Sequence, residues 1–335
     1  RGFELVRNDY LDYRRAIHSD LWNNVLYIDI LKDIKSQSIE IISKDIDIPI
    51  TQDNTKNNKN NLKLFLKKII FKIFNFLQIF SRESDAFIIK SYLPILSEIK
   101  LKILLGQFPL MLKTPEINYN FLHEDKVDRK DFYLEYEKFN GAERQVRRLV
   151  NKLIPKIYIE GYESTCKQAS DLKWPSKPKF IYTSSAFTAD EIFKFWVGSK
   201  VEKGIPYYAG QHGANYGTLY ESRSWPELNT VDRFYSWGWE NIYKDQKVIP
   251  AFNFKIINSI DYKYKKTGNL FLVETSPGTR DGIRDRFYQN MIAHNDMVEL
   301  YGLLGKEIQA DSIVRLHHRS EDLNAWQEKY QFIKI

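Results

Sequence analysis

A lone histidine between small residues is the clearest candidate for chemistry in this sequence. The stretch GIPYYAGQHGANYGT, residues 204–218, places His212 at the end of an apolar segment. An imidazole titrates near neutral pH, so it can take the proton of a hydroxyl that attacks an electrophile, such as a sugar hydroxyl. Gly210 and Gly213 would leave room for a substrate beside it. The alternative is a histidine that bonds a backbone carbonyl in a tight turn.

A second candidate is the segment ETSPGTR, residues 274–280, which follows an apolar run. The hydroxyls of Thr275 and Ser276 and nearby backbone amides can hold a phosphate, and Arg280 offers a forked donor. The alternative is a simple Ser-Pro-Gly turn with a solvated arginine, and the spacing alone favours that alternative.

The third candidate is VRLHHRS, residues 314–320, at the end of another apolar run. It brings together Arg315, His317, His318 and Arg319, four cationic or near-cationic side chains at one strand end. Such a cluster suits a phosphate or a nucleotide. A solvated basic edge is the alternative.

A strand-helix-strand pattern surrounds His212. Residues 180–185 predict a short strand, and residues 205–213 predict the next one. The helix between them is expected to begin at Thr188, with Glu191 as its capping-box partner, and to end at Gly204. Such a unit predicts a parallel sheet, whose ligands bind beyond the carboxyl ends of its strands. The residues expected to line a cleft at that edge are Ser184, Ser185, Gln211, Gly213, Asn215 and Tyr216.

The same pattern restarts in the last quarter of the chain. Residues 270–282 predict a strand and its loop, residues 283–305 a long helix, and residues 311–323 another strand. Residues 231–239 predict one more strand of the first block, whereas 248–254 and 261–269 are expected to form a linker. Two α/β blocks joined by a linker predict two Rossmann-like domains that face a cleft.

The N-terminal part is expected to be rich in helices. Residues 1–50 contain a helical pattern that Asn8 or Asp9 is placed to cap, and the segments 84–113 and 117–153 also look helical. Pro155 ends the last of these, and residues 156–162 predict a short strand.

The segment LKLFLKKIIFKIFNFLQIF, residues 62–80, is apolar with four lysines and no acidic residue. It follows an Asn-rich polar stretch, residues 51–61. One interpretation is a helix that lies on an anionic membrane surface with its lysines at the headgroups. The other is a buried helix whose lysines reach solvent through their long stems.

Composition narrows the classes of protein. The chain has 335 residues, a net charge of +7 and a single cysteine, Cys166. One cysteine excludes an intramolecular disulfide and a cysteine-based zinc site, and it fits a reducing compartment. The sequence contains no Walker-type loop, no GxGxxG and no HExxH motif. Because the chain starts at Arg1 and ends in an apolar run, we expect it to be a piece of a longer protein.

The string KFIYTSSAFTADEIFKFWVGSKVEKGIPYYAGQHGANYG, followed by DRFYSWGW, resembles a family of bacterial surface-carbohydrate transferases found with O-antigen lipopolysaccharide biosynthesis. The resemblance covers about residues 150–280 and, more loosely, residues 22–31. The sequence is also distantly similar to GT-B transferases of the teichoic-acid polymerase and capsule Kdo-transferase type.

The resemblance implies roles for particular residues. His212 matches an acceptor-side histidine that is a candidate base in those transferases. The loop that opens their donor domain is matched by Thr275, Ser276 and Arg280, and the nucleotide-side strand end is matched by Arg315 with His317; Arg319 belongs to the same basic cluster. A later Asp-and-Ser loop, which such donor domains use on the diphosphate, would lie beyond Ile335, so the C-terminal domain is expected to be truncated.

The fold expected is therefore α/β and GT-B-like. Residues 1–260 would form an acceptor-side domain with a helical insertion at about 51–113, and residues 266–335 the start of a nucleotide-sugar-binding domain. The expected function is metal-independent transfer of a sugar from a nucleotide sugar, as donor substrate with no cofactor, to a lipid-linked or oligosaccharide acceptor. The protein would be cytoplasmic, peripheral on the inner face of the membrane.

Two other functions remain open at this point. A polyol-phosphate transferase of the teichoic-acid kind would use the same scaffold. A basic, non-catalytic module that binds nucleic acid would use the positive charge, but that charge is scattered along the chain, and no nucleic-acid partner is expected.

Overall fold

The computed structural model describes residues 4–17, 19–34, 80–108, 114–117, 119, 129, 133–213, 216, 225–240, 247–256, 269–273 and 287–315. The chain forms two compact units. The first comprises Arg1–Tyr13 and Ile30–Ser259, and the second comprises Arg14–Asp29 and Ile260–Ile335. The predicted domain boundary and the predicted roles of the two domains stay predictions.

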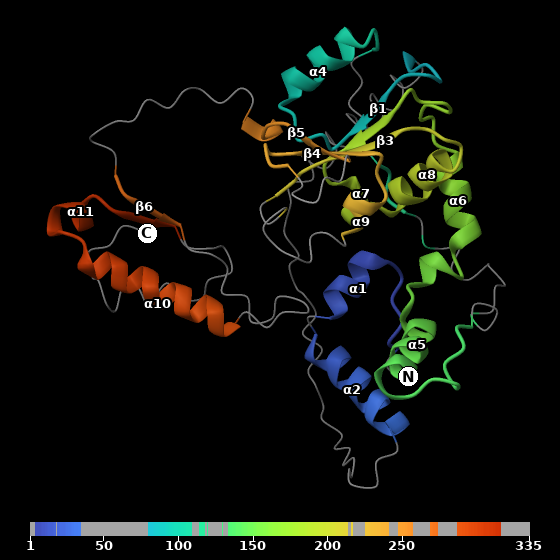
Figure 1. Cartoon of the computed structure of the whole chain (residues 1–335), viewed down its shortest axis with the longest axis horizontal. Coiled ribbons are helices and arrows are strands. Elements are labelled where there is room, and N and C mark those ends of the chain that lie inside the picture. Colours follow the sequence, from blue (N-terminus) through green and yellow to red (C-terminus); the bar gives the residue numbers. More distant parts are fainter. Residues whose placement is uncertain are drawn as a thin grey trace, which may run out of the picture. The chain divides into compact units, whose positions relative to one another are not determined.

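A five-stranded parallel sheet organises the first unit (Figure 1). Its strands are β1 (Phe87–Ile89), β2 (Ile181–Thr183), β3 (Tyr207–Gly210), β4 (Arg233–Ser236) and β5 (Val248–Pro250). They lie in the order β1-β2-β3-β4-β5, and each pairs in parallel with its neighbour. The predicted α/β class with a parallel sheet is confirmed, and the carboxyl ends of all five strands meet at one edge.

One face of this sheet packs against α6 (Tyr162–Ser170) and α8 (Glu191–Val201), which lie side by side in Figure 1. Alternate strand residues point to this face because side chains in a strand alternate between its two sides. Buried side chains that meet there include Phe87, Ile181, Tyr207 and Phe234 from the strands and Phe193 and Trp196 from α8. This core holds the sheet against its helices.

The other face of the sheet carries tyrosines. Tyr182, Tyr208 and Tyr235 are half-buried, and Tyr235 meets the other two rings edge to face. A Cβ atom on Gly210 would lie 2.1 Å from the hydroxyl oxygen of Tyr182 and 2.9 Å from Oγ of Ser184. The prediction that Gly210 leaves room for a substrate is therefore wrong, because the tips of these two side chains occupy that room.

The helix before β3 begins later than predicted. Thr188 lies in a short helix, α7 (Ala186–Ala189), and the N-cap of α8 is Asp190, whose Oδ1 accepts a hydrogen bond from the backbone N–H of Phe193 at 3.1 Å. A carboxylate at this position satisfies a free amide and faces the positive end of the helix dipole. Gly204 ends the helical stretch in the left-handed region, with φ of +77°, as predicted.

Three predicted elements differ in the structure. Residues 87–89 were expected to be helical, but in the structure they form β1. The sheet therefore includes residues that the predicted insertion at 51–113 covers. Residues 248–250 were expected to belong to a linker, but in the structure they form β5. Residues 156–162 were expected to be a strand, but they form a 3₁₀ turn, η4 (Lys156–Tyr158), and lead into α6. Three-residue strands are too short to display a two-residue periodicity in the sequence.

The other helical elements that precede residue 257 in the described chain are α1 (Tyr10–Ala16), α2 (Asp20–Ile34), α4 (Ile95–Leu104), α5 (Gly141–Leu153), α9 (Pro226–Asn229) and the 3₁₀ turn η6 (Phe254–Ile256). The predicted cap at Asp9 is confirmed, since its Oδ1 accepts a hydrogen bond from the backbone N–H of Asp12 at 2.7 Å. The predicted helix over 117–153 is confirmed only at its end, in α5, because residues 133–140 are not helical.

The second unit contains the predicted strand-helix-strand repeat. Strands β6 (Phe271–Val273) and β7 (Ile313–Arg315) pair in parallel, and α10 (Phe287–Leu303) and α11 (Lys306–Ala310) lie between them in the chain. Leu272, Val298, Tyr301 and Val314 form its core. The described part of this unit after residue 268 is thus an α/β block, in which Figure 1 labels β6, α10 and α11.

Candidate active site at the carboxyl edge of the sheet

His212 lies directly beyond the carboxyl end of β3. The backbone N–H of Gln211 donates to the carbonyl oxygen of Tyr235 at 2.9 Å, so the sheet ladder continues to the residue before the histidine. The imidazole is half-buried, and the ring of Phe187, from α7, meets it edge to face with the centroids 5.7 Å apart. The sequence prediction of its position, at the strand end where parallel sheets bind ligands, is confirmed.

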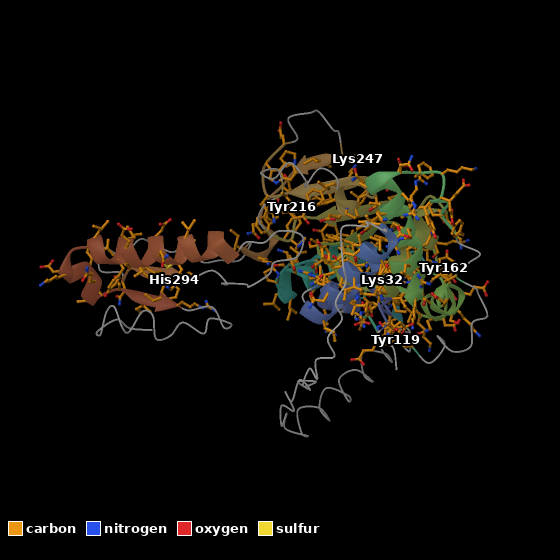
Figure 2. The ribbon with its side chains drawn as sticks, turned by 90° about the horizontal axis from the view of Figure 1, so that it is seen from below. Lys32, Tyr119, Tyr162, Tyr216, Lys247 and His294 are labelled. Atoms are coloured by element: carbon orange, nitrogen blue, oxygen red, sulfur yellow. The ribbon has the colours of Figure 1, made fainter. Side chains whose placement is uncertain are left out.

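A chain of two hydrogen bonds runs inward from the imidazole. The hydroxyl oxygen of Tyr216 lies 2.7 Å from Nδ1 of His212 and 2.5 Å from Oε1 of Glu227. Tyr216, which Figure 2 labels, and Glu227 are both buried, at 3% and 8% exposed. Glu227 is in the first turn of α9, after Pro226 at N1. Buried polar groups in such a chain fix each other's orientation.

The hydrogen-bond chain determines which imidazole nitrogen is free. The single proton of the Tyr216 hydroxyl goes to the Glu227 carboxylate, so the tyrosine oxygen can only accept from His212. Nδ1 of His212 therefore carries its proton, and Nε2 keeps an unshared electron pair. Burial, and then the hydrogen bond to Glu227, raise the pKa of Tyr216, which keeps this hydroxyl protonated. His212 is thus arranged to accept a proton at Nε2.

Two charged groups act on His212 in opposite directions. Burial lowers the pKa of the imidazole below 6.5, the Glu227 carboxylate opposes that change, and the Lys255 ammonium adds to it. Nζ of Lys255 lies 3.4 Å from the backbone oxygen of His212 and 4.2 Å from the centroid of the Tyr92 ring. With its pKa lowered, the imidazole is neutral at pH 7, as a general base must be.

Gln211, expected to face the acceptor, turns its side chain into the protein. Its Nε2 donates to the carbonyl oxygen of Gly213, and its Oε1 accepts from the backbone N–H of Trp237 and from Nε1 of Trp239, each at 2.8 Å. The side chain is 4% exposed. It therefore joins the loop after β3 to the loop after β4 and fixes the backbone that carries His212.

We expect Gln211→Ala to lower the free energy of unfolding by about 2–4 kcal/mol, because two N–H groups and one carbonyl lose their partner in a buried place. Urea denaturation followed by tryptophan fluorescence measures this change. Trp239→Phe is the matched variant, since it removes one donor and leaves Gln211 bonded to Trp237, and it should cost about 1 kcal/mol. A Gln211→Ala protein as stable as the wild type would contradict this role.

The two serines predicted for the acceptor side follow β2. Ser184 is fully buried, and its Oγ donates to the backbone oxygen of Ser91 at 2.9 Å. Ser185 is only partly buried and starts α7, where its backbone N–H donates to Oγ1 of Thr183 at 3.3 Å. Asn215 lies outside the described residues. Ser185 and Gly213 are thus the predicted acceptor residues that remain partly open.

The structure adds residues that the sequence did not single out. Lys90 and Tyr92 follow β1 with φ of +46° and +62°, a conformation that non-glycine residues rarely adopt and that is often found at functional sites. Nζ of Lys90 is 2.9 Å from Oδ2 of Asp190, which also accepts a hydrogen bond from Thr114. Glu227 was also not singled out, because a glutamate after Pro226 looks in the sequence like an ordinary first-turn carboxylate. Only its burial in the structure distinguishes it.

The predicted phosphate-binding residues belong to the second unit. Arg315 ends β7 and is exposed. Thr275, Ser276, Arg280, His317 and Arg319 lie outside the described residues, so their grouping around a phosphate stays a prediction. Within the described residues no group of three or more His, Cys, Asp or Glu side chains is placed to hold a metal ion.

A parallel α/β sheet with a neutral, oriented histidine at its carboxyl edge defines an enzyme-like α/β protein. The chain belongs to the LIC12162 family of transferases, whose pattern it matches over residues 2–335. No curated protein and no solved structure matches the chain. The predicted transferase class is confirmed by the family, and the protein is an enzyme of that class.

Proposed function

We propose that this transferase is a metal-independent glycosyltransferase of the GT-B type that acts in bacterial surface-polysaccharide biosynthesis, of O-antigen, lipopolysaccharide or capsule. It would transfer a sugar from a nucleotide sugar to a lipid-linked or oligosaccharide acceptor. The first unit would hold the acceptor and the second the donor. The protein would work in the cytoplasm, at the inner face of the membrane.

In the proposed reaction, Nε2 of His212 takes the proton of an acceptor hydroxyl. The acceptor oxygen forms a bond to the anomeric carbon of the donor sugar, while the bond from that carbon to the phosphate oxygen breaks. The electron pair leaves with the nucleotide diphosphate, whose charge Arg315 and the other basic residues of the second unit would stabilise. The Tyr216 hydroxyl and the Glu227 carboxylate stabilise the imidazolium that forms.

The observation that carries this proposal is the His212–Tyr216–Glu227 chain. It leaves a neutral imidazole nitrogen at the edge where parallel α/β sheets bind ligands, and the family supplies the transferase class. Group transfer to a hydroxyl needs a base of this kind. The resemblance of the GQHG and SWGW strings to surface-carbohydrate transferases supports a sugar as the group transferred.

A donor-binding screen tests the proposal. UDP-, GDP-, dTDP- and CMP-sugars are titrated into the whole protein by calorimetry, and the donors that bind are then incubated with lipid-linked and oligosaccharide acceptors. Product analysis by mass spectrometry should show a new glycosidic bond. A product joined by a phosphodiester would overturn sugar transfer in favour of polyol-phosphate transfer, and binding to generic nucleic acid without any donor would overturn both.

The pH dependence of the reaction should report His212. Because the neutral imidazole is the base and burial lowers its pKa, kcat/KM should fall on the acid side with a midpoint below pH 6.5. Glu227→Gln removes a charge that raises this pKa, so the midpoint should move to lower pH. Lys255→Met removes a charge that lowers it, so the midpoint should move to higher pH.

Glu227→Gln and Lys255→Met together control for damage to the fold. A damaged site would lower kcat/KM, but it would not shift the acid-side midpoint in opposite directions in the two variants. Rates with the identified donor and acceptor are measured from pH 5 to 9. An acid midpoint that stays in place in both variants would mean that another group is the base.

A further inference from the structure

Helix α4, Ile95–Leu104, buries two of its charged side chains and exposes two of its leucines. Glu98 and Lys102 are 4% and 3% exposed, whereas Leu96 and Leu104 are 76% and 75% exposed. Ile95 and Ile103 are exposed as well. Helices on protein surfaces usually show the opposite arrangement, with the apolar stripe toward the core. Exposed apolar side chains gathered on one helix mark a site of interaction.

Polar contacts fix the helix in this orientation. Nζ of Lys102 lies 3.0 Å from Oε1 of Glu98, and Oγ of Ser91, after β1, donates to Oε2 of Glu98 at 2.6 Å. Nε2 of Gln107 donates to the backbone oxygen of Ala86 at 3.0 Å. The exposed leucines are therefore not the result of a helix free to turn about its axis, since rotation would break the hydrogen bond from Ser91 to Glu98 and bring the buried Glu98 and Lys102 to the surface.

The exposed apolar surface extends beyond α4. Phe108, after the helix, stacks on Phe80, with the ring centroids 5.0 Å apart, and both rings are exposed. Phe80 is the last residue of the apolar stretch 62–80, whose charged residues are four lysines. On α4 itself the exposed charge is Lys100. The stacked pair of Phe80 and Phe108 thus joins the last residue of a lysine-rich sequence, whose residues 62–79 lie outside the described part, to the end of α4.

We propose that the outer face of α4, formed by Ile95, Leu96, Ile103 and Leu104 with Lys100, docks on an anionic lipid surface. Leucine and isoleucine side chains enter the boundary between headgroups and acyl chains, and lysines pair with lipid phosphates. This face holds the protein on the bilayer and does not depend on which group the enzyme transfers.

The helix lies on the membrane and does not cross it. Its ten residues span about 15 Å, half of the hydrocarbon thickness of a bilayer. In the part of the chain that the structure describes, no helix is long and apolar enough to cross a membrane.

Vesicle co-sedimentation tests the proposal. The whole protein should pellet with vesicles of phosphatidylcholine and phosphatidylglycerol and much less with phosphatidylcholine alone. Leu96→Gln with Leu104→Gln should lower the partition coefficient about tenfold or more, because two leucines no longer enter the bilayer. Leu300→Gln with Leu303→Gln is the matched control, since these leucines are also exposed on a helix, α10, at 50% and 79%. This control should bind like the wild type.

A labelled protein gives a readout that does not depend on loss of binding. With Cys166→Ser as background, Leu104→Cys or Leu303→Cys carries an NBD fluorophore, whose emission rises in an apolar medium. Anionic vesicles should raise the emission at position 104 and not at position 303.

Equal binding of the Leu96/Leu104 variant and the wild type, or no change in emission at position 104, would overturn the proposal. A wild-type dimer in sedimentation velocity that the same variant converts to a monomer would assign the face to a second copy instead. Weaker binding of Lys100→Gln to the anionic vesicles supports the part assigned to charge.

Discussion

His212→Ala should lower the rate of transfer by about 10²- to 10⁴-fold, the usual contribution of a positioned general base. The imidazole is the group that Tyr216 and Glu227 orient, and its Nε2 is the nitrogen left without a proton. Donor binding should change little, because the residues expected to hold the nucleotide belong to the second unit. Initial rates with saturating donor, together with calorimetric titration of the donor, separate the two effects.

Two further variants make this result specific. Tyr216→Phe keeps the ring in the core and removes only the hydroxyl, so His212 loses its orientation, and we expect a loss of about a hundredfold. His294→Ala, on α10 and labelled in Figure 2, removes another histidine that has no part in the proposed reaction. It should leave the rate near that of the wild type. Wild-type turnover in His212→Ala would exclude this histidine as the base.

Glu98→Ala should lower the free energy of unfolding by about 3–5 kcal/mol, a large part of the stability of an ordinary domain. The change deprives Lys102 of its buried carboxylate and Ser91 of its acceptor. Burial already lowers the pKa of Lys102, and Glu98 opposes that effect. Without Glu98 the pKa falls further, so the variant should regain stability as the pH rises toward about 10.4, the ordinary lysine value.

The exposed pair Glu143–Arg147 is the matched control, because it has the same four-residue spacing on a helix and a similar distance, 3.0 Å. Glu143→Ala should cost no more than about 1 kcal/mol. Glu98→Leu with Lys102→Met replaces the buried pair by apolar side chains, and its stability should stay within about 1 kcal/mol of the wild type or exceed it. Urea denaturation measures all three. Equal losses for Glu98→Ala and Glu143→Ala would contradict the burial argument.

The central part of the fold could be predicted because its elements have strong local signals. Strands β2 and β3 are apolar runs on either side of a helix that Gly204 ends, and that pattern is typical of parallel sheets. The edge strands β1 and β5 could not be predicted in the same way. The segment around Ile88 continues into a helical pattern, and β5 ends at Pro250, which made it look like a linker.

The histidine of the candidate site could be predicted, but its partners could not. His212 stood out because of its glycines and its place after a strand. Tyr216 looked like a wall of the cleft and is instead a buried hydrogen-bond partner, and Glu227, fifteen residues beyond His212 in the chain, showed nothing unusual in sequence. Which of two polar groups in a loop turns inward depends on tertiary packing, and a single sequence does not display that packing.

The order of the strands has a consequence for how the sheet assembles. Paired residues in β2 and β3, such as Ile181 and Tyr207, are 26 positions apart, whereas Phe87 of β1 pairs with Ile181, 94 positions away. Closing the longer loop costs about 1 kcal/mol more in chain entropy. Residues 181–250 thus form a nearly local sheet of four strands, and β1, although it leaves the ribosome first, is the one long-range addition at its border.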